Sequence, residues 1–211
     1  MKIAIIGANG FIGSKIRDEA LLKNHEVVAI TRASQIKKDK NLKGFQQTIF
    51  EPTKLKKILK DVDVIVSAYH PGWYHVDPVN RYLEGYEIII KLAKELNKRL
   101  IIIGGSTNLD LADGTPVVEG FFPAPWKDAL EGTRKLYELI KDDKSFDWTY
   151  LAPAAEVIDT VKTGNYAIGE NTLIVDSKDV SRISTQDLAE AVILEIENPK
   201  YKQKRFTLGY K

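Results

Sequence analysis

Three glycines near the N-terminus have the spacing of a phosphate-binding turn. Gly7, Gly10 and Gly13 follow the apolar run 3–6 and precede a segment with helical periodicity. Such a turn presents free backbone amides at the start of a helix, where the helix dipole favours negative charge. The glycines would allow a tight turn, a close approach to a pyrophosphate, and close packing of helix on strand. Strand, glycines and helix in this order predict a dinucleotide site; a turn that binds nothing is the alternative.

The end of the second apolar run indicates which dinucleotide would bind. Proteins that prefer NAD(H) normally carry an acidic residue there, which binds the ribose hydroxyls. This chain has Thr31 and Arg32 instead. A guanidinium can form paired hydrogen bonds with a 2′-phosphate and cannot accept one from a hydroxyl. We therefore predict that NADP(H) is preferred over NAD(H); Arg32 stacked on adenine or exposed to solvent is the alternative.

Candidate substrate-binding residues occur in later loops. Ser106, directly after Gly104 and Gly105, is the best polar candidate to orient a substrate or a carboxamide, and capping of a turn is the alternative. Two loops are rich in aromatic side chains, which can hold a planar ligand or pack together as a small separate core. The first contains Tyr69, His70, Trp73, Tyr74 and His75, the second Phe121, Phe122 and Trp126, and the predicted substrate contacts are His70, Trp73, Phe121 and Trp126.

These residues need a scaffold, and apolar runs that alternate with helical segments predict one. The pattern is typical of parallel strands joined by crossover helices. After Pro153 the chain changes to short strands and turns, then to a helix that begins at Ser184 with Asp187 in its first turn. Residues 1–211 are thus predicted to form a single-domain Rossmann α/β fold, a doubly wound and mostly parallel sheet with a small C-terminal substrate-side extension at about 154–211. The predicted strands are 3–6, 27–31, 46–50, 62–68, 100–103, 148–151 and 205–209, and the clearest helices lie in 12–24, 79–96 and 130–140.

Composition excludes several classes of function. The 31 basic and 29 acidic residues nearly cancel, so charge alone would not recruit nucleic acid or an anionic membrane. The absence of cysteine excludes disulfides and thiolate sites. No metal site is expected, because His70 and His75 have only Asp77 nearby. Without a secretory signal or an apolar run of about 18 residues, a cytoplasmic protein with a small-molecule partner is expected; an oligomeric state is not indicated.

Taken in chain order, these motifs resemble those of the atypical short-chain dehydrogenase/reductases. The glycine turn and Arg32 are followed by Ser67-Ala68-Tyr69, by Gly104-Gly105-Ser106 and by the segment 148–153. The similarity continues through 181–184 and 205–210, and so extends over essentially the whole chain. Within this group the chain is similar to small NAD(P)-binding proteins of the NADH-flavin reductase type, to biliverdin-IXβ reductase and to NmrA-like regulators.

The resemblance implies a role for each matching position. One departure from the family concerns Thr48, which stands where the pattern usually has an aspartate near adenine. The implied pyrophosphate contacts are Gly7, Asn9, Gly10, Phe11, Ile12 and Gly13; the adenosine contacts are Arg32, Ile49 and Phe50; and the contacts around the nicotinamide and its ribose are Ser67, Ala68, Tyr69, Gly104, Gly105, Ser106 and Pro153.

Tyr137 and Lys141 match the Tyr-x-x-x-Lys pattern with which typical short-chain dehydrogenases protonate a carbonyl. Tyr137 lies only 16 residues before Pro153, whereas the family's tyrosine lies further upstream. It also falls on the apolar helix face with Leu130 and Thr133, where packing is a sufficient explanation. We therefore favour a packing role for Tyr137; a catalytic role for the pair is the alternative.

Three functions follow from the resemblance as expectations. The first is an NAD(P)H-dependent reductase that transfers hydride to a planar acceptor such as FMN or FAD, which needs parallel rings more than a dedicated acid. The second is a regulatory sensor that binds NADP(H) without turnover, as in NmrA-like proteins. A nucleotide-sugar epimerase or dehydratase is less favoured, because few residues follow Pro153 to form a substrate domain.

Overall fold

A central sheet of eight strands organises the molecule in the computed structural model, which describes residues 1–33, 39–72, 75–120 and 124–211 but not the side chains of 124–129. Neighbouring strands are parallel, except that β8 runs antiparallel to β10. In spatial order the strands are β3 (Leu42–Gln46), β2 (Glu26–Thr31), β1 (Lys2–Ile6), β4 (Val64–Ser67), β5 (Arg99–Ile103), β6 (Trp148–Pro153), β10 (Lys204–Gly209) and β8 (Ala167–Gly169).

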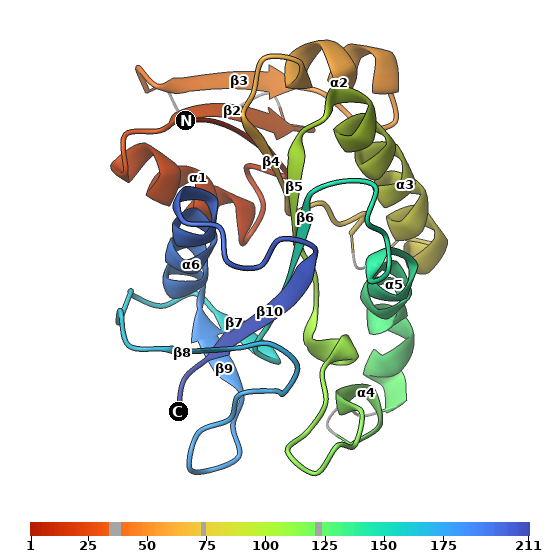
Figure 1. Ribbon diagram of the computed structural model, residues 1–211, viewed down its shortest axis with the longest axis vertical. Helices are drawn as coiled ribbons and strands as arrows, with labels where there is room; N and C mark the ends of the chain where they lie inside the picture. Colours follow the sequence, from red (N-terminus) through yellow and green to blue (C-terminus); the bar gives the residue numbers. More distant parts are fainter. Residues whose placement is uncertain (34–38, 73–74, 121–123) are drawn as a thin grey trace.

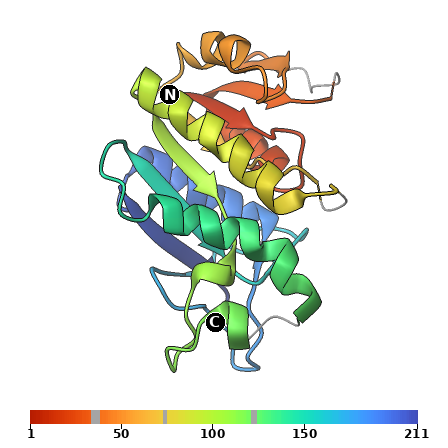
Figure 2. The ribbon, with the colours of Figure 1, turned by 90° about the vertical axis from the view of Figure 1, so that its right-hand side faces the viewer.

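Helices cover both faces of this sheet (Figure 1). One face carries α1 (Gly13–Leu22) and α6 (Thr185–Glu197), and the other carries α2 (Pro52–Leu59), α3 (Pro78–Leu96) and α5 (Ala124–Ile140). Figure 2 shows α3 and α5 crossing the sheet side by side. Because strand side chains alternate between faces, Ile3 and Ile5 pack towards α1 and α6, whereas Ala4 and Ile6 pack towards α3.

The first six strands have the order of a doubly wound Rossmann sheet, which confirms the predicted fold class. In this topology the chain leaves β1 towards one edge of the sheet and returns to β4 on the other side of β1. Ligands of open α/β sheets bind at the carboxyl ends of the strands beside such a reversal. A ligand site is therefore expected at the carboxyl ends of β1 and β4.

The third strand was wrongly placed at 46–50. The structure has β3 at Leu42–Gln46, and residues 47–50 instead form a loop at the carboxyl edge of the sheet. As an edge strand, β3 has mostly exposed side chains and therefore gives little hydrophobic signal. Ile49 and Phe50 resemble strand residues, but Ile49 is buried against the helices and both line a pocket.

The helix α2 was missing from the sequence prediction. Pro52 begins it, a position where the ring fits because the first helical amide needs no partner. Leu55 and Leu59, four residues apart, are completely buried and hold the helix on the sheet. Proline at the first turn followed by two leucines one turn apart was a usable signal.

Residues after Pro153 contribute to two parts of the structure. The helix α6 and the strand β10 complete the main body, and the N-cap of α6 is Ser184 as expected, with its Oγ 2.9 Å from the amide of Asp187. A second sheet of β7 (Glu156–Ile158) and β9 (Arg182–Ser184) lies near β8, at the carboxyl end of the main sheet (Figure 1). The short helices η1 (Ser106–Asn108) and α4 (Val117–Gly120) lie at the same end.

No helix within the described ranges combines the length and apolar character that a membrane-spanning segment requires.

Candidate cofactor-binding site

A pocket of about 760 Å³ opens at the carboxyl ends of β1 and β4. Its lining comes from the glycine turn, from the ends of β2, β4 and β5, and from α3 and α5. A volume of this size is ordinary for a small-molecule or cofactor site. Of the residues implied to bind cofactor, those that line it are Gly7, Asn9, Gly10, Phe11, Ile12, Gly13, Arg32, Ile49, Phe50, Ala68, Tyr69, Gly104 and Gly105.

The three glycines of the turn are required for different reasons. Gly7 has a φ of +84°, and a Cβ there would lie 2.6 Å from the carbonyl oxygen of Ala68. A Cβ at Gly13 would overlap the carbonyl of Gly7. At Gly10 the sole described neighbour of an added Cβ would be the Gly7 carbonyl oxygen, at 3.1 Å. The fold itself thus demands Gly7 and Gly13, whereas Gly10 leaves backbone bare in the pocket, as a pyrophosphate requires.

The buried side chain of Arg17 forms hydrogen bonds with this turn. The Arg17 guanidinium donates hydrogen bonds to the carbonyl of Ala8, at 3.1 Å, and to Oδ1 of Asn9, at 2.8 Å. Its Nε bonds Asp18 at 3.0 Å, and the residue is only 8% exposed. Because Ala8 and Asn9 lie between two of the glycines, Arg17 ties the first helix to the conformation of the turn.

We expect Arg17→Met to destabilise the fold by about 1–3 kcal/mol and to weaken NADPH binding by about tenfold, since the turn loses two hydrogen bonds, one of them buried. Thermal unfolding and calorimetric titration with NADPH measure the two effects. Lys23→Met removes a charge at the exposed far end of α1 and should change neither quantity. An Arg17→Met protein with wild-type affinity would show that the turn holds its shape alone.

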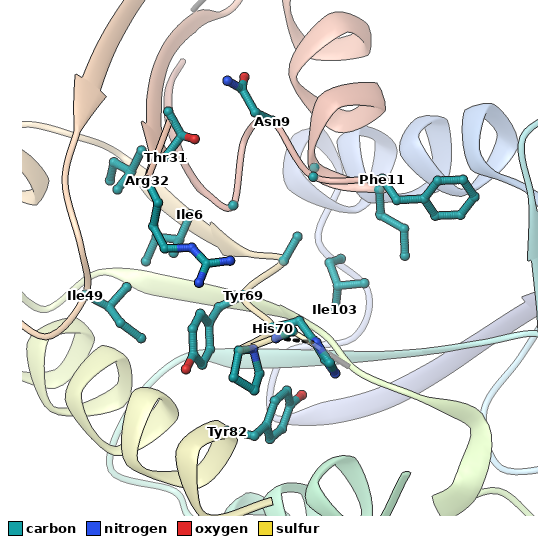
Figure 3. Close-up of a pocket in the computed structure, with 18 of the residues that line it drawn as sticks. Ile6, Asn9, Phe11, Thr31, Arg32, Ile49, Tyr69, His70, Tyr82 and Ile103 are labelled. Atoms are coloured by element: carbon teal, nitrogen blue, oxygen red, sulfur yellow. Dashed lines mark hydrogen bonds between the residues drawn. The ribbon is translucent and has the colours of Figure 1, made fainter. Parts of the chain in front are cut away.

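The part of the pocket beside Arg32 and Phe50 has a positive character. The guanidinium of Arg32 reaches across the pocket towards Tyr69 and His70 (Figure 3). Arg81 lies over the ring of Phe50, with its guanidinium carbon 3.3 Å from the ring centre. Among the described residues that line the pocket there is no aspartate or glutamate. The arrangement suits a ligand that carries several phosphates.

Another part of the pocket is lined mostly by uncharged residues. Gly104 and Gly105 line it together with Tyr82, Thr133 and His70. A Cβ at Gly104 would overlap the Tyr150 ring, and one at Gly105 would come within 2.9 Å of the Thr133 hydroxyl oxygen. The two glycines therefore let the end of β5 lie directly against these side chains. This part could receive a flat ring.

Burial sets the protonation of two side chains here. It lowers the pKa of His70, and the nearby charge of Arg32 lowers that pKa further. The Nδ1 atom of His70 accepts a hydrogen bond from the amide of Gly72 at 3.1 Å, which requires the neutral ring. Burial also raises the pKa of Tyr69 to about 12 despite the charges of Arg81 and Arg32. Both groups are therefore neutral at pH 7.

Several predicted site residues do not line the pocket. Ser67 is completely buried behind it, where its Oγ lies 3.2 Å from the Tyr86 hydroxyl. Pro153 is buried at the end of β6, and Ser106 is 5% exposed at the start of η1; neither is among the described lining residues. The remaining predicted residues were aromatic: His70 lines the pocket, Trp73, Tyr74, Phe121 and Phe122 lie outside the described residues, and the side chain of Trp126 is not described.

The structure places Tyr137 and Lys141 away from the pocket. Among the described side chains of α5, Leu130 and Thr133 line the pocket, and Tyr137 lies one turn further along. The Tyr137 ring packs 5.2 Å from that of Tyr150, and Lys141 forms an exposed ion pair with Glu138. This arrangement agrees with the expected packing role.

Four contributors to the site were not identified from sequence: Arg17, Arg81, Tyr82 and Thr133. Tyr82 and Thr133 were read only as members of apolar helix faces. The sequence signal that could have identified both residues was a hydroxyl group on an otherwise apolar helix face. Both residues line the pocket together with the glycine turn. In the described ranges, no three His, Asp or Glu side chains gather as metal ligands, and the absence of a metal site stays a prediction.

Comparison with known proteins shows which family the chain belongs to. Residues 7–199 match a family described as NAD(P)H-binding. The Bacillus subtilis protein YwnB is 33% identical over 99% of this chain and 98% of its own. A proposed epimerase of Bacteroides thetaiotaomicron has 32% identity and a TM-score of 0.91, over 99% of this chain and 96% of that one. A proposed NADH-flavin reductase of Streptococcus pneumoniae has 28% identity and a TM-score of 0.88, with both chains fully covered. The chain therefore belongs to the NAD(P)H-binding family, in keeping with its resemblance to the atypical short-chain dehydrogenase/reductases.

Proposed function

We propose that this protein is an NADPH-dependent reductase that transfers hydride to a planar acceptor such as free flavin. One observation carries the proposal: a single pocket contains the glycine turn, the cationic side chains of Arg32 and Arg81, and an uncharged part lined by Gly104, Gly105 and Thr133. A dinucleotide extended along this pocket would place its nicotinamide between Gly104 and the aromatic side chains. An acceptor ring could then stack on the nicotinamide.

The chain's own residues would supply binding and orientation. Backbone amides of the glycine turn would hold the pyrophosphate, and Arg32 would bind the 2′-phosphate of NADPH. When bound, the reduced nicotinamide supplies the hydride. The similar structure from Streptococcus pneumoniae, itself a proposed NADH-flavin reductase, supports flavin as the acceptor.

An epimerase reaction is the second candidate, because the similar Bacteroides structure is a proposed epimerase. In short-chain dehydrogenases that act on alcohols and carbonyls, the Tyr-x-x-x-Lys pair handles the proton. Here Tyr137 packs against Tyr150 and Lys141 pairs with Glu138 on the surface. The geometry therefore favours the reductase.

Stopped-flow mixing of the protein and NADPH with FMN tests the proposal. We expect the protein to accelerate the loss of NADPH absorbance well above the uncatalysed rate. Tight NADPH binding without oxidation would refute the reductase and support a regulatory sensor. A cytoplasmic location and a small-molecule partner, rather than nucleic acid or membrane, remain predictions from sequence.

A further inference from the structure

The side chain of Tyr150, on β6, lies directly behind the uncharged part of the pocket. It is completely buried and is not among the described lining residues. A Cβ at Gly104 would overlap the ring and hydroxyl of Tyr150, so Gly104 leaves room for this side chain. Gly104 itself lines the pocket. Tyr150 can therefore influence a bound ligand only through its neighbours.

The Tyr150 hydroxyl forms three hydrogen bonds, one to each of three segments. It accepts from the amide of Gly105 at 3.2 Å and from the side-chain amide of Asn108 at 3.0 Å. It donates to the carbonyl of Thr133 at 3.0 Å. A phenol has one proton and two lone pairs, so these bonds use its full capacity. One oxygen thus ties together the turn after β5, the helix η1 and the helix α5.

A buried arginine fixes the direction of these bonds. The guanidinium of Arg205, on β10, donates to both the carbonyl oxygen and the Oδ1 atom of Asn108. Because arginine only donates, Oδ1 of Asn108 faces Arg205 and the amide nitrogen faces Tyr150. The Tyr150 proton is thereby left for the Thr133 carbonyl. Burial raises the pKa of Tyr150 above its ordinary value, so this proton is retained at neutral pH.

The same network sets how closely β5 and α5 approach each other at the pocket. The hydroxyls of Thr107 and Thr133 lie 3.0 Å apart, and Gly105 packs directly against Thr133. Gly105 and Thr133 both line the pocket. Loss of the Tyr150 hydroxyl would deprive the Gly105 amide of a hydrogen bond. A donor that loses its partner inside a protein costs more than the bond itself contributes, so we expect the segment to move.

We infer, building on the proposed reductase function, that Tyr150 is a positioning residue: its hydroxyl keeps Gly104, Gly105 and Thr133 where they hold the nicotinamide ring for hydride transfer. Hydride transfer needs donor and acceptor rings at a fixed separation, and a displacement of about 1 Å can lower the rate about a hundredfold. Tyr150 touches neither ring and exchanges no proton in the reaction.

This role also accounts for two side chains on the far side of Tyr150. The Tyr137 ring packs 5.2 Å from the Tyr150 ring. The guanidinium carbon of Arg205 lies 4.6 Å from the centre of the Tyr137 ring. Arg205 is only 8% exposed, and it also bonds Oδ1 of Asn171 at 2.8 Å. Tyr137 and Arg205 thus support the site from behind Tyr150.

The Tyr150→Phe variant removes one oxygen, and two ligands that differ in the nicotinamide measure its effect. 2′-Phospho-ADP-ribose has the adenosine, the phosphates and both riboses of NADPH but no nicotinamide. By calorimetric titration, we expect Tyr150→Phe to bind NADPH about tenfold more weakly and 2′-phospho-ADP-ribose within about twofold of the wild type. With NADPH and FMN both saturating, kcat should fall by at least about tenfold.

Thr149→Val is the matched control. Thr149 is the neighbouring residue of β6 and is equally buried, and its hydroxyl bonds Arg99 and the Tyr201 carbonyl, each at 2.9 Å. This variant should lower the melting temperature, as Tyr150→Phe does, but should leave the ratio of the two ligand affinities unchanged. An equal change of that ratio in both variants would mean that lost stability alone produces it, and would overturn the inference.

Asn108→Ala disturbs the same network while the Tyr150 side chain stays in place. It removes one donor to the Tyr150 hydroxyl, and Arg205 keeps its bond to the carbonyl of residue 108. We expect the same selective loss, about threefold for NADPH and none for 2′-phospho-ADP-ribose. Should Tyr150→Phe fail to fold, Asn108→Ala decides, and a wild-type ratio of affinities in it would overturn the inference.

The inference and the reductase proposal can fail separately. If the wild-type protein reduces FMN and Tyr150→Phe keeps the wild-type ratio of affinities, the inference fails and the reductase stands. If the wild-type protein does not oxidise NADPH, the reductase fails, and a selective loss of NADPH affinity in Tyr150→Phe still supports the inference. A wild-type protein that binds both ligands equally tightly would show that no nicotinamide is held beside Gly104, and would overturn it.

Discussion

A Gly10→Val protein is expected to lose at least about a hundredfold in affinity for both NADPH and NADH while it keeps its fold. The φ of Gly10 is not left-handed, so a side chain is allowed there, and its sole described close neighbour is the Gly7 carbonyl oxygen. The valine side chain would occupy the space that two linked phosphates need. Calorimetric titration with each coenzyme measures the loss.

Two further glycine variants make this result specific. Gly10→Ala adds one methyl group and should lose less affinity than Gly10→Val. Gly13→Ala places a Cβ against the Gly7 carbonyl and should lower the melting temperature, whereas Gly10→Val should leave it nearly unchanged. Retained coenzyme affinity in a folded Gly10→Val protein would exclude the glycine turn as the pyrophosphate site.

Exchange of Arg32 for aspartate should invert the coenzyme preference. Arg32→Asp removes charge-assisted hydrogen bonds to the 2′-phosphate and sets a carboxylate against it, so NADPH affinity should fall by about thirty- to a hundredfold. NADH should bind equally well or better, because a carboxylate can accept hydrogen bonds from the ribose hydroxyls. Titration with both coenzymes gives the ratio of affinities.

Lys60→Asp is the matched control for this exchange. It makes the same change of charge at an exposed position at the end of α2 and should leave both affinities unchanged. Equal losses of NADPH and NADH affinity in Arg32→Asp would mean that Arg32 contacts a group the two coenzymes share, such as adenine. The assignment of NADP(H) specificity would then be withdrawn.

Local sequence was sufficient for the features that short segments encode. The glycine turn is complete within the first 13 residues, and the cap of α6 is formed by Ser184 and Asp187. Buried parallel strands such as β5 are uniformly apolar and therefore easy to recognise. The edge strand β3 was misplaced by four residues, because an exposed edge has no such pattern.

The uncharged part of the pocket could not be derived in this way. It is formed by α3, α5 and the end of β5, which are far apart in the chain and meet only when the helices pack on one face of the sheet. Sequence periodicity placed Tyr82 on an apolar face, but its place in the lining of the pocket depends on how α3 lies relative to α5 and the end of β5.

The sequence by itself determined a Rossmann fold with a dinucleotide turn followed by an arginine, because these features depend on backbone freedom and on residues adjacent in the chain. Only the tertiary structure decided that Arg17 braces the turn, that Tyr137 lies outside the pocket and that Tyr82 lines it. Those outcomes depend on the angle and depth at which helices pack, and that geometry is set by side chains distant in sequence.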